Sequence, residues 1–456
     1  MDVKQKNVTV VGLGVSGYAA AVLLDRLGAK VFVTDDGSTD AVKEHAEVLR
    51  SYGVEVEIGG HTKAAVRSSE LIVVSPGVEN SSSAMRWAGE AKLPVISEME
   101  LGFCFSKGRV LAVTGTNGKS TVVSLVGSML RLSGIDAITC GNIGNPLSGE
   151  VDRMNKDTWA VLEVSSFQLE RIRSFRPDIA VVLNITDDHL DRYRDFKEYY
   201  EAKTKVFLNQ TGNDTLILNH DAINVRLLKE RSSSRVLFYS SKERVKGSFL
   251  EDGIVRSVFG ARDLRLLEKR QIPLKGTHNL ENVLAASCAA LVAGAGADGI
   301  RRAIEEFRGL DHRLQSVSSI HGVEFIDDSK STTVDSTARA LEWCSGPVIL
   351  IAGGKDKRSD YAAALGSLSG NCKAIVLIGE TKEKLKEIFS SVVPCHFADS
   401  LEDAVVKSFG MAKRGDRILL SPMCSSFDMF SDYKHRAAVF RKAVRELKNR
   451  VEISGL

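Results

Sequence analysis

The stretch from Arg109 to Thr121, R-V-L-A-V-T-G-T-N-G-K-S-T, decides the fold of the chain's centre. Its apolar run Val110–Val113 predicts a buried parallel strand, and apolar residues recur with helical spacing after Lys119. Two glycines between strand and helix allow a tight turn that aims backbone N–H groups and the positive end of the helix dipole at one point. We therefore predict an ATP site, with the hydroxyl of Ser120 or Thr121 as a ligand for Mg²⁺, and Ser120 is the one assigned. The residues expected at ATP are Gly115, Thr116, Asn117, Gly118, Lys119, Ser120 and Thr121.

This turn departs from the common phosphate-loop spacing G-x-x-x-x-G-K-[ST], because position 113 holds valine instead of glycine. The alternative is a glycine-rich connector that only joins the strand to the helix. The Gly-Lys-Ser-Thr string at a predicted helix start favours the phosphate site.

The composition indicates an ordinary globular protein. The 456 residues suffice for about three domains, and a net charge of +3 with mixed signs favours neither nucleic acid nor an anionic membrane. Seven scattered cysteines without C-x-x-C spacing indicate reduced thiols rather than a zinc site. No export signal or long apolar span is recognisable, so we expect a cytoplasmic protein. The polar, charge-mixed segments 231–248 and 254–272 are predicted to be surface loops.

A second glycine-rich turn, G-L-G-V-S-G at 12–17, follows the predicted strand Val8–Val11. An acidic residue, Asp35, ends the next strand about 20 positions later, which is the pattern of diphosphate-binding turns. An NAD-dependent oxidoreductase, a nucleotide-sugar site and a turn that serves only packing are all possible interpretations. Nothing downstream supplies a hydride-transfer site, so the nucleotide sugar is favoured, with Gly14, Val15, Ser16 and Asp35 as contacts. Asp35 could instead cap the following turn.

Four polar residues further along could bind ligands. Asn142 lies in the turn G-N-I-G-N-P and either contacts the sugar or shapes the turn. Glu163 ends an apolar strand at 159–164, where a carboxylate is costly unless it is ion-paired or binds a metal, so it is a magnesium ligand or part of a buried salt bridge. By residue type alone, His189 is an ordinary histidine and Lys203, on a predicted helix over 196–208, a solvated lysine.

The string T-G-T-N-G-K-S-T resembles the phosphate loop of the Mur ligases and the folylpolyglutamate synthases, which activate a carboxylate with ATP. The resemblance continues in D-H-L-D at 188–191, A-K at 202–203 and G-T-H-N-L-E-N at 276–282. It implies that His189 and a carbamylated Lys203 join Glu163 as magnesium ligands and, with Lys119, are catalytic. It also places Gly77 at a UDP-sugar. Many relatives have Thr-Arg where this chain has Asp36-Gly37, which favours the phosphate contacts of Val15 and Ser16 over any from positions 36 and 37.

The same resemblance assigns residues near the C-terminus. Asn279 and Asn282 share a helix face suited to adenine, although Asn279 could also be an N-cap. Arg313, Asp328 and Lys330 are assigned to ATP. The strings D-D-S-K-S-T, G-G-K-D-K and S-P-M-C-S-S-F-D-M-F resemble most the family members that add D-glutamate, and the D-N-P-R string of diamino-acid-adding members is absent. The residues implied at D-glutamate are Thr332, Lys357, Ser426 and Phe427, against the alternative that such lysines are merely solvated.

We therefore expect an α/β protein of three domains. Residues 1–98 form a Rossmann-like UDP-sugar-binding domain, residues 99–308 a central P-loop ATPase-like domain, and residues 309–456 a Rossmann-like domain that binds D-glutamate. The resemblance implies a monomeric, ADP-forming ligase that uses ATP and Mg²⁺ and acts on small molecules only. Its reaction joins UDP-N-acetylmuramoyl-L-alanine to D-glutamate through an acyl phosphate, in cytoplasmic peptidoglycan precursor synthesis. Another Mur-family or folylpolyglutamate-type amide ligase is the alternative.

Overall fold

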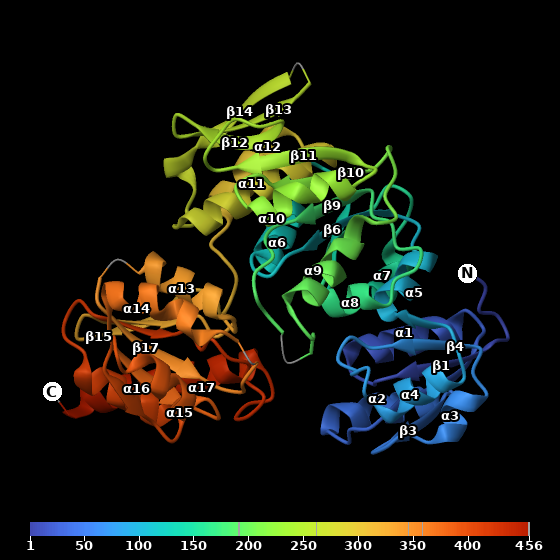
Figure 1. Cartoon of the computed structure of the whole chain (residues 1–456), viewed down its shortest axis with the longest axis horizontal. Coiled ribbons are helices and arrows are strands. Elements are labelled where there is room, and N and C mark those ends of the chain that lie inside the picture. The colour runs from blue at the N-terminus through green and yellow to red at the C-terminus, as the bar shows by residue number, and fades with distance from the viewer. Residues whose placement is uncertain (190–191, 261, 345, 358, 455–456) are drawn as a thin grey trace. The chain divides into compact units, whose positions relative to one another are not determined.

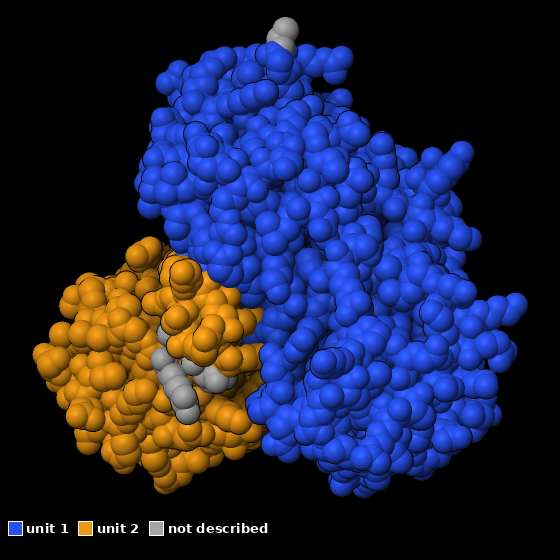
Figure 2. All heavy atoms as spheres, turned by 45° about the vertical axis from the view of Figure 1, so that its right-hand side comes forward, with its two compact units in different colours: residues 1–185, 200–273, 280–307 blue, residues 186–199, 274–279, 308–456 orange. Residues whose placement is uncertain are grey.

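The structure is a computed structural model that describes residues 1–189, 192–260, 262–344, 346–357 and 359–454. The chain divides into two compact units (Figure 2), the first made of residues 1–185, 200–273 and 280–307 and the second of residues 186–199, 274–279 and 308–456. Three sheets with helices packed on them, two in the first unit and one in the second, confirm the expected α/β class (Figure 1). None of the described helices combines the length and the apolar character needed to cross a membrane.

The first sheet is parallel, with strand order β3-β2-β1-β4-β5. Apolar side chains of α1, α2 and α5 cover one face, and those of α3 and α4 cover the other. The order reverses between β1 and β4, which opens a crevice beyond their carboxyl ends. The bounds are β1 Asn7–Val11, α1 Val15–Arg26, β2 Lys30–Asp35, α2 Asp40–Ser51, β3 Glu55–Ile58, α3 Lys63–Arg67, β4 Leu71–Val74, α4 Ser83–Glu90, β5 Val95–Ser97 and α5 Glu98–Phe105.

The second sheet has the order β14-β13-β12-β11-β10-β9-β6-β8-β7 and is parallel from β7 to β12. Strand β6, which precedes the phosphate loop, lies between β9 and β8, and α6, α11 and α12 pack against the sheet through one apolar cluster. The strands are β6 Arg109–Thr114, β7 Ala137–Gly141, β8 Trp159–Glu163, β9 Ile179–Val182, β10 Thr215–Asn219, β11 Arg235–Ser240, β12 Gly247–Glu251, β13 Ile254–Phe259 and β14 Arg262–Glu268. The helices are α6 Lys119–Leu132, α7 Leu147–Glu150, α8 Ser166–Glu170, α9 Phe196–Thr204, α10 Ile223–Arg226, α11 Thr277–Val292 and α12 Ala297–Glu306.

The prediction of surface loops at 231–248 and 254–272 is wrong. These segments contain β11, β13, β14 and the first two residues of β12, and β13 pairs antiparallel with both β12 and β14. The mixed charges that suggested a loop form ion pairs across the strands, such as Arg256 with Asp263 at 2.9 Å and Arg256 with Glu251 at 3.2 Å. Strands with one solvated face carry such charges while their apolar residues, such as Phe249 and Val255, are buried.

The third sheet, in the second unit, has the order β15-β16-β20-β17-β18-β19 and is parallel except for β15. Helices α13, α14 and α15 cover one face and α16 and α17 the other, as a doubly wound sheet requires. The bounds are β15 Gln315–Ile320, β16 Val323–Asp327, α13 Val334–Trp343, β17 Val348–Gly353, α14 Leu365–Asn371, β18 Cys372–Ile378, α15 Lys382–Phe389, β19 Cys395–Phe397, α16 Leu401–Met411, β20 Arg417–Leu420 and α17 Tyr433–Ser454.

Candidate active site

The phosphate loop joins β6 to α6, as the sequence predicts, and two of its positions require glycine. Gly118 precedes α6 in a left-handed conformation, with φ of 87°, and a Cβ there would lie 2.4 Å from Oδ1 of Asn282. Gly115 has φ of 154°, and its Cβ would meet the side chain of Leu183 at 3.0 Å. The loop therefore holds its shape against the end of β9 and the start of α11 only because both residues lack a side chain.

Asn184, which follows β9, holds this loop in place. Its backbone carbonyl accepts a hydrogen bond from the N–H of Thr116 at 2.8 Å, and its Oδ1 accepts one from the N–H of Asn117 at 2.8 Å. Its Nδ2 donates in turn to the carbonyl of Asn117 at 3.1 Å. Asn184 is therefore a positioning residue for the turn that is expected to hold phosphate.

Two lysines meet at one carbonyl oxygen of the loop. Nζ of Lys119 donates to the carbonyls of Gly115 and Thr116, both at 2.8 Å, and Nζ of Lys203 donates to the carbonyl of Gly115 at 2.9 Å. Lys203 is only 2% exposed, so the interpretation as a solvated helix lysine is wrong. Two ammonium groups and the N-terminus of α6 concentrate positive charge at this point, which suits a polyphosphate.

Glu163 lies next to the loop on the neighbouring strand, in register with Val113. Its Oε1 accepts a hydrogen bond from Nδ2 of Asn142 at 2.8 Å, whereas its Oε2 is buried without a hydrogen-bond partner among the described residues. An amide partner in place of a cation argues against the buried-salt-bridge interpretation. A buried, unpaired carboxylate oxygen beside a phosphate loop fits a divalent cation, so the residues here suit Mg²⁺.

A cavity of about 700 Å³ opens in the first unit where α1 begins. All six residues predicted at the UDP-sugar line it: Gly14, Val15, Ser16, Asp35, Gly77 and Asn142. The first three form the start of α1 and Asn142 follows β7, so the cavity has walls from the first sheet and from the second. Through Asn142 it is also one hydrogen bond away from Glu163.

Asp35 shapes the turn that borders this cavity. Its Oδ1 accepts a hydrogen bond from the N–H of Gly37 at 2.7 Å, and its Oδ2 accepts one from the N–H of Leu13. The first of these bonds is the turn cap that the alternative interpretation foresaw. Gly17 is needed for close packing, because a Cβ there would lie 1.7 Å from the carbonyl oxygen of Gly12.

In the second unit, Asp328 follows β16 and is fully enclosed. Ser421 donates to its Oδ2 at 2.8 Å and the N–H of Leu314 to its Oδ1 at 3.2 Å. Burial raises the pKa of Asp328 to about 6, even though Arg313 and these hydrogen bonds act in the opposite direction. Nζ of Lys330 lies 5.6 Å from the ring centre of Tyr433.

His278 and Asn279 also belong to the second unit. Burial, together with the charges of Arg339 and Arg313, lowers the pKa of His278 to about 4. Nδ2 of Asn279 donates to the carbonyl of Lys275 at 2.8 Å. Because α11 begins at Thr277, Asn279 lies within the first turn, and the N-cap interpretation is wrong.

The residues predicted at D-glutamate come from three loops of the third sheet. Nζ of Lys357 lies 3.4 Å from Oγ1 of Thr332 and forms a buried ion pair with Asp188 at 3.1 Å. The alternative that Lys357 is merely solvated is therefore wrong. Residues 355 and 425 form a bridge, which places the loop of Lys357 beside that of Ser426 and Phe427. Ser426 is buried, and Phe427 is 67% exposed.

The candidate residues divide between the units. Lys119, Ser120, Glu163, Lys203 and Asn282 belong to the first unit. His189, Asn279, Arg313, Asp328 and Lys330 belong to the second, where His189 has φ of 55° and its Nε2 lies 3.4 Å from Asp188. Leu190 and Asp191 of the D-H-L-D string lie outside the described residues.

Comparison with known proteins identifies the family. Three family models match in order: the Mur ligase MurD-like N-terminal domain at residues 6–97, the Mur ligase middle domain at 113–290 and the Mur ligase glutamate ligase domain at 312–424. The chain is 44% identical over 447 residues to a UDP-N-acetylmuramoylalanine--D-glutamate ligase of Acidobacterium capsulatum, covering 97% of each chain. The chain belongs to the Mur ligase family.

Further Mur ligases show the same likeness. An enzyme of the same name from Koribacter versatilis is 42% identical, with 98% of this chain and 99% of the relative covered. Among solved structures, the UDP-N-acetylmuramate-alanine ligase of Thermotoga maritima matches with a TM-score of 0.61 at 18% identity, covering 97% of this chain and all of that one. A pseudomurein peptide ligase type C of Methanothermus fervidus also gives 0.61 at 18% identity, with the same coverage. The Mur ligase fold thus extends over nearly the whole chain.

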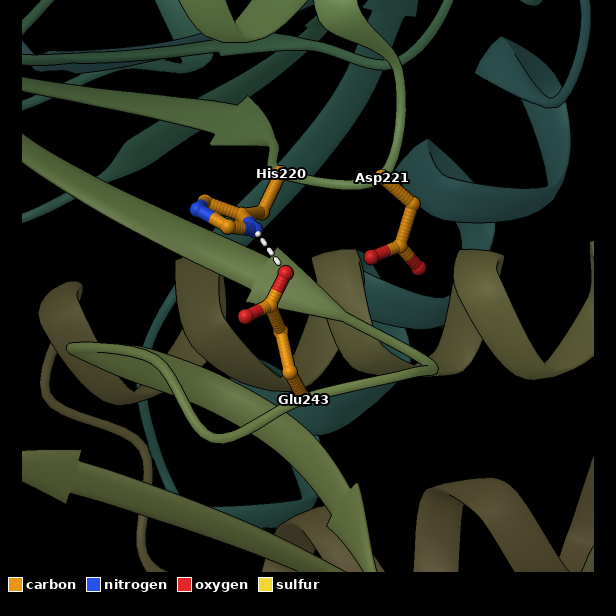
Figure 3. Close-up of side chains that lie close together, drawn as sticks. All are labelled: His220, Asp221 and Glu243. Carbon is orange, nitrogen blue, oxygen red and sulfur yellow. Dashed lines mark ion pairs between the residues drawn. The ribbon is translucent and has the colours of Figure 1, made fainter.

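This Mur ligase also has a group of possible metal ligands outside the site, formed by His220, Asp221 and Glu243 (Figure 3). Nδ1 of His220 lies 3.1 Å from Oε1 of the exposed Glu243, and both oxygens of Asp221 accept hydrogen bonds, from Ser240 and Ser241. These contacts tie the segment after β10 to the segment after β11. These contacts account for the proximity of the three side chains without a metal ion.

Arg436 is a positioning residue that the sequence did not indicate. It is completely buried on α17, where it donates to Oγ and the carbonyl of Ser329 at 3.0 and 2.9 Å and to the carbonyl of Cys424 at 3.3 Å. Burial lowers its pKa to about 10. It thus links two of the three loops expected to hold D-glutamate. In sequence it is one basic residue of the K-H-R string, with no motif to mark it.

Proposed function

We propose that this chain joins D-glutamate to the alanyl carboxylate of UDP-N-acetylmuramoyl-L-alanine and converts ATP to ADP and phosphate. One observation carries the proposal: a cavity at a diphosphate-type turn is connected, through Asn142 and Glu163, to a phosphate loop with two lysines. This arrangement suits a long substrate whose nucleotide is held at one end while its carboxylate reaches the phosphate. The names of the relatives supply the identity of the two substrates.

In this proposal the sugar nucleotide occupies the cavity. Its diphosphate lies at the start of α1, where Val15 and Ser16 offer backbone N–H groups and the helix dipole favours negative charge. Asn142 lies at the sugar end, so the appended L-alanine points toward Glu163. Gly77, from the loop after β4, lines the cavity between these ends.

ATP binds at the loop of residues 115–121, with Asn282 and Asn279 assigned to adenine. Ser120, Glu163, His189 and a carbamylated Lys203 would hold Mg²⁺, which neutralises charge on the transferring phosphate. The buried, unpaired Oε2 of Glu163 supports this ligand set, and so does the burial of Lys203, because an enclosed amine gives up its charge more readily than a solvated one.

The reaction has two steps. An oxygen of the alanyl carboxylate attacks the γ-phosphorus, the bond to the β-phosphate oxygen breaks, and an acyl phosphate and ADP result. The neutral amine of D-glutamate then attacks the acyl carbon and forms the C–N bond. The tetrahedral intermediate gives the amine proton to solvent, and its C–O bond to phosphate breaks, which leaves the amide and inorganic phosphate. Lys119 stabilises the charge of the transferring phosphate, and fixed placement of both substrates supplies much of the remaining rate.

D-Glutamate binds in the second unit at Thr332, Lys357, Ser426 and Phe427. The support is their position on three adjoining loops, where a cation, hydroxyls and backbone N–H groups suit an amino acid with two carboxylates. Arg313, Asp328 and Lys330 are assigned to ATP. Closure of the C-terminal domain on the central one during turnover follows from this division, and boundaries at residues 98 and 308, a cytoplasmic location and a monomer remain predictions.

The test is ADP formation with purified protein, ATP, Mg²⁺, UDP-N-acetylmuramoyl-L-alanine and a panel of amino acids, with mass spectrometry of the product. We expect ADP and an amide product with D-glutamate, and neither with L-glutamate or meso-diaminopimelate. Product formation with L-glutamate and a folate would instead establish the folylpolyglutamate alternative. A change in NADH fluorescence on adding the protein would support the oxidoreductase interpretation.

A further inference from the structure

The nucleoside end of the cavity is formed by the loops after β2 and β3. If the diphosphate lies at the start of α1, the strand order β3-β2-β1 places these loops on the side to which the nucleoside extends. The residues that line the cavity there are Asp35, Asp36 and His61. Both oxygens of Asp35 already accept backbone N–H groups, and Asp36 is exposed. His61 is the third polar side chain at this end of the cavity lining.

His61 is held by a chain of hydrogen bonds that begins at Glu57. The hydroxyl of Thr34 donates to Oε1 of Glu57 at 2.7 Å, and the N–H and hydroxyl of Thr62 donate to the same carboxylate, each at 2.8 Å. Burial raises the pKa of Glu57, but the hydrogen bonds from Thr34 and Thr62, together with the nearby His61, outweigh this and hold the pKa below its ordinary value. Glu57 therefore stays ionised and keeps the Thr34 hydrogen directed at itself.

This chain fixes which nitrogen of His61 carries the proton. Oγ1 of Thr34 lies 2.7 Å from Nδ1 of His61, and because its hydrogen is given to Glu57, it must accept a hydrogen bond from Nδ1–H. In a neutral imidazole Nε2 is then the acceptor. Nε2 has no hydrogen bond to any of the described residues, and the ring lines the cavity.

We infer that His61 is a specificity-determining residue, whose Nε2 accepts a hydrogen bond from the imide N–H of a uracil base. The inference rests on the proposed function and names the group of the substrate that this part of the cavity recognises. Uracil presents an N–H at position 3, whereas cytosine presents a lone pair there, so an acceptor fixed at Nε2 attracts the first base and repels the second. A site with one correctly placed polar partner discriminates in this way because the wrong base covers the acceptor without pairing with it.

The test compares UDP with CDP in titration calorimetry on the full chain. The wild-type protein should bind UDP more tightly, and His61→Ala should weaken UDP binding about tenfold while CDP binding stays unchanged, as expected for one lost hydrogen bond. His61→Gln, which keeps an acceptor, should restore part of the preference. Thr34→Val removes the partner of Nδ1 at nearly constant shape and should also lower the ratio of the two affinities. The control is His396→Ala, an exposed histidine of the second unit.

Every outcome of these titrations either supports the role of His61 or overturns it. An unchanged ratio of UDP to CDP affinity in folded His61→Ala overturns the inference, and if that variant unfolds on heating much earlier than wild type, Thr34→Val decides instead. Wild-type protein that forms the amide product but shows no such preference leaves the proposed function intact and refutes only the role of His61. Wild-type protein that neither binds UDP nor forms product refutes both.

Discussion

The two glycine-rich turns of the first unit have the same backbone plan and different charges. Each follows a strand that lies between two parallel neighbours, and each begins a helix, β1 with α1 and β6 with α6. The turn before α1 is bordered by the carboxylate of Asp35 and has no lysine among the residues that line its cavity. The turn before α6 has two lysines at Gly115 and the carboxylate of Glu163 on the adjoining strand.

This difference shows how one anion-binding motif, a glycine-rich turn before a helix, can serve either binding or catalysis. Backbone N–H groups and a helix dipole suffice to hold a diphosphate that does not react. Transfer of a phosphoryl group requires positive charge where the transition state develops negative charge. Only the second turn provides it, through Lys119 and through the carboxylate of Glu163, which would hold Mg²⁺. The first turn is therefore expected to bind and the second to catalyse.

Lys119→Ala should give the largest difference between the functions of the two turns. Loss of this charge should lower kcat for amide formation by at least about 10³-fold, as for other groups that stabilise a transferring phosphate. Binding of UDP at the other turn should not change. Steady-state kinetics and calorimetry on the same preparation measure both, with the exposed Lys43→Ala as control. A parallel loss of UDP affinity would show that the turns do not act separately.

The magnesium requirement should respond to the carboxylate of the second turn only. Glu163→Gln keeps an acceptor for Asn142 but loses the charge, and it should raise the Mg²⁺ concentration for half-maximal rate at least about 10-fold, since even outer partners of metal ligands cost about 10–100-fold. Asp35→Asn should alter UDP binding and leave the Mg²⁺ dependence as it is. Titration of the rate with Mg²⁺ measures this, and equal Mg²⁺ dependence of Glu163→Gln and wild type would contradict the ligand assignment.

A methyl group added to each turn should have opposite consequences. Gly118→Ala should lower the free energy of unfolding by about 1–2 kcal/mol from the left-handed backbone alone, and by more because of the contact with Asn282. Gly14 has φ of −70° and no atom within 4 Å of an added Cβ, so Gly14→Ala should keep wild-type stability and weaken UDP binding by intruding on the cavity. Thermal unfolding and UDP titration test both. A strongly destabilised Gly14→Ala would be the contrary result.

The smallest effect is expected on acidification at the first turn. The folded-state pKa of Glu57 lies below its unfolded value of 4.5, so the stability it contributes is fully present above pH 4.5 and is lost as the pH falls through the folded-state pKa. Thermal unfolding between pH 6 and pH 3.5 should therefore show a slightly shallower loss of Tm in Glu57→Gln than in wild type. Identical slopes would mean that Glu57 does not stabilise its hydrogen bonds with Thr34 and Thr62 through its charge.

Local patterns sufficed for much of the fold. The phosphate loop, the first turn and their strands lie where Val110–Val113 and Val8–Val11 predicted them, because turn and helix-start chemistry is encoded within a few residues. The strands β12 to β14 were missed because their charges pair across strands, and such pairs have no fixed spacing in the sequence.

Residues that act through tertiary contacts could not be recognised from the sequence. Asn184, which follows another strand, accepts a hydrogen bond from the phosphate loop. Arg436 donates hydrogen bonds both to Ser329, more than one hundred positions earlier in the chain, and to Cys424, which is close to it in sequence. For Asn184 a weak signal existed, since it is the first polar residue after a buried strand. Lys203 shows the reverse case, because composition suggested a solvated side chain and only the family resemblance pointed to the site in which it is buried.

The most direct test of the central claim follows oxygen from substrate to product. UDP-N-acetylmuramoyl-L-alanine labelled with oxygen-18 in the alanyl carboxylate is incubated with wild-type protein, ATP, Mg²⁺ and D-glutamate, and the released phosphate is analysed by mass spectrometry. Activation of the carboxylate at the Lys119 loop predicts one labelled oxygen in each phosphate. Amide formation with unlabelled phosphate would contradict it.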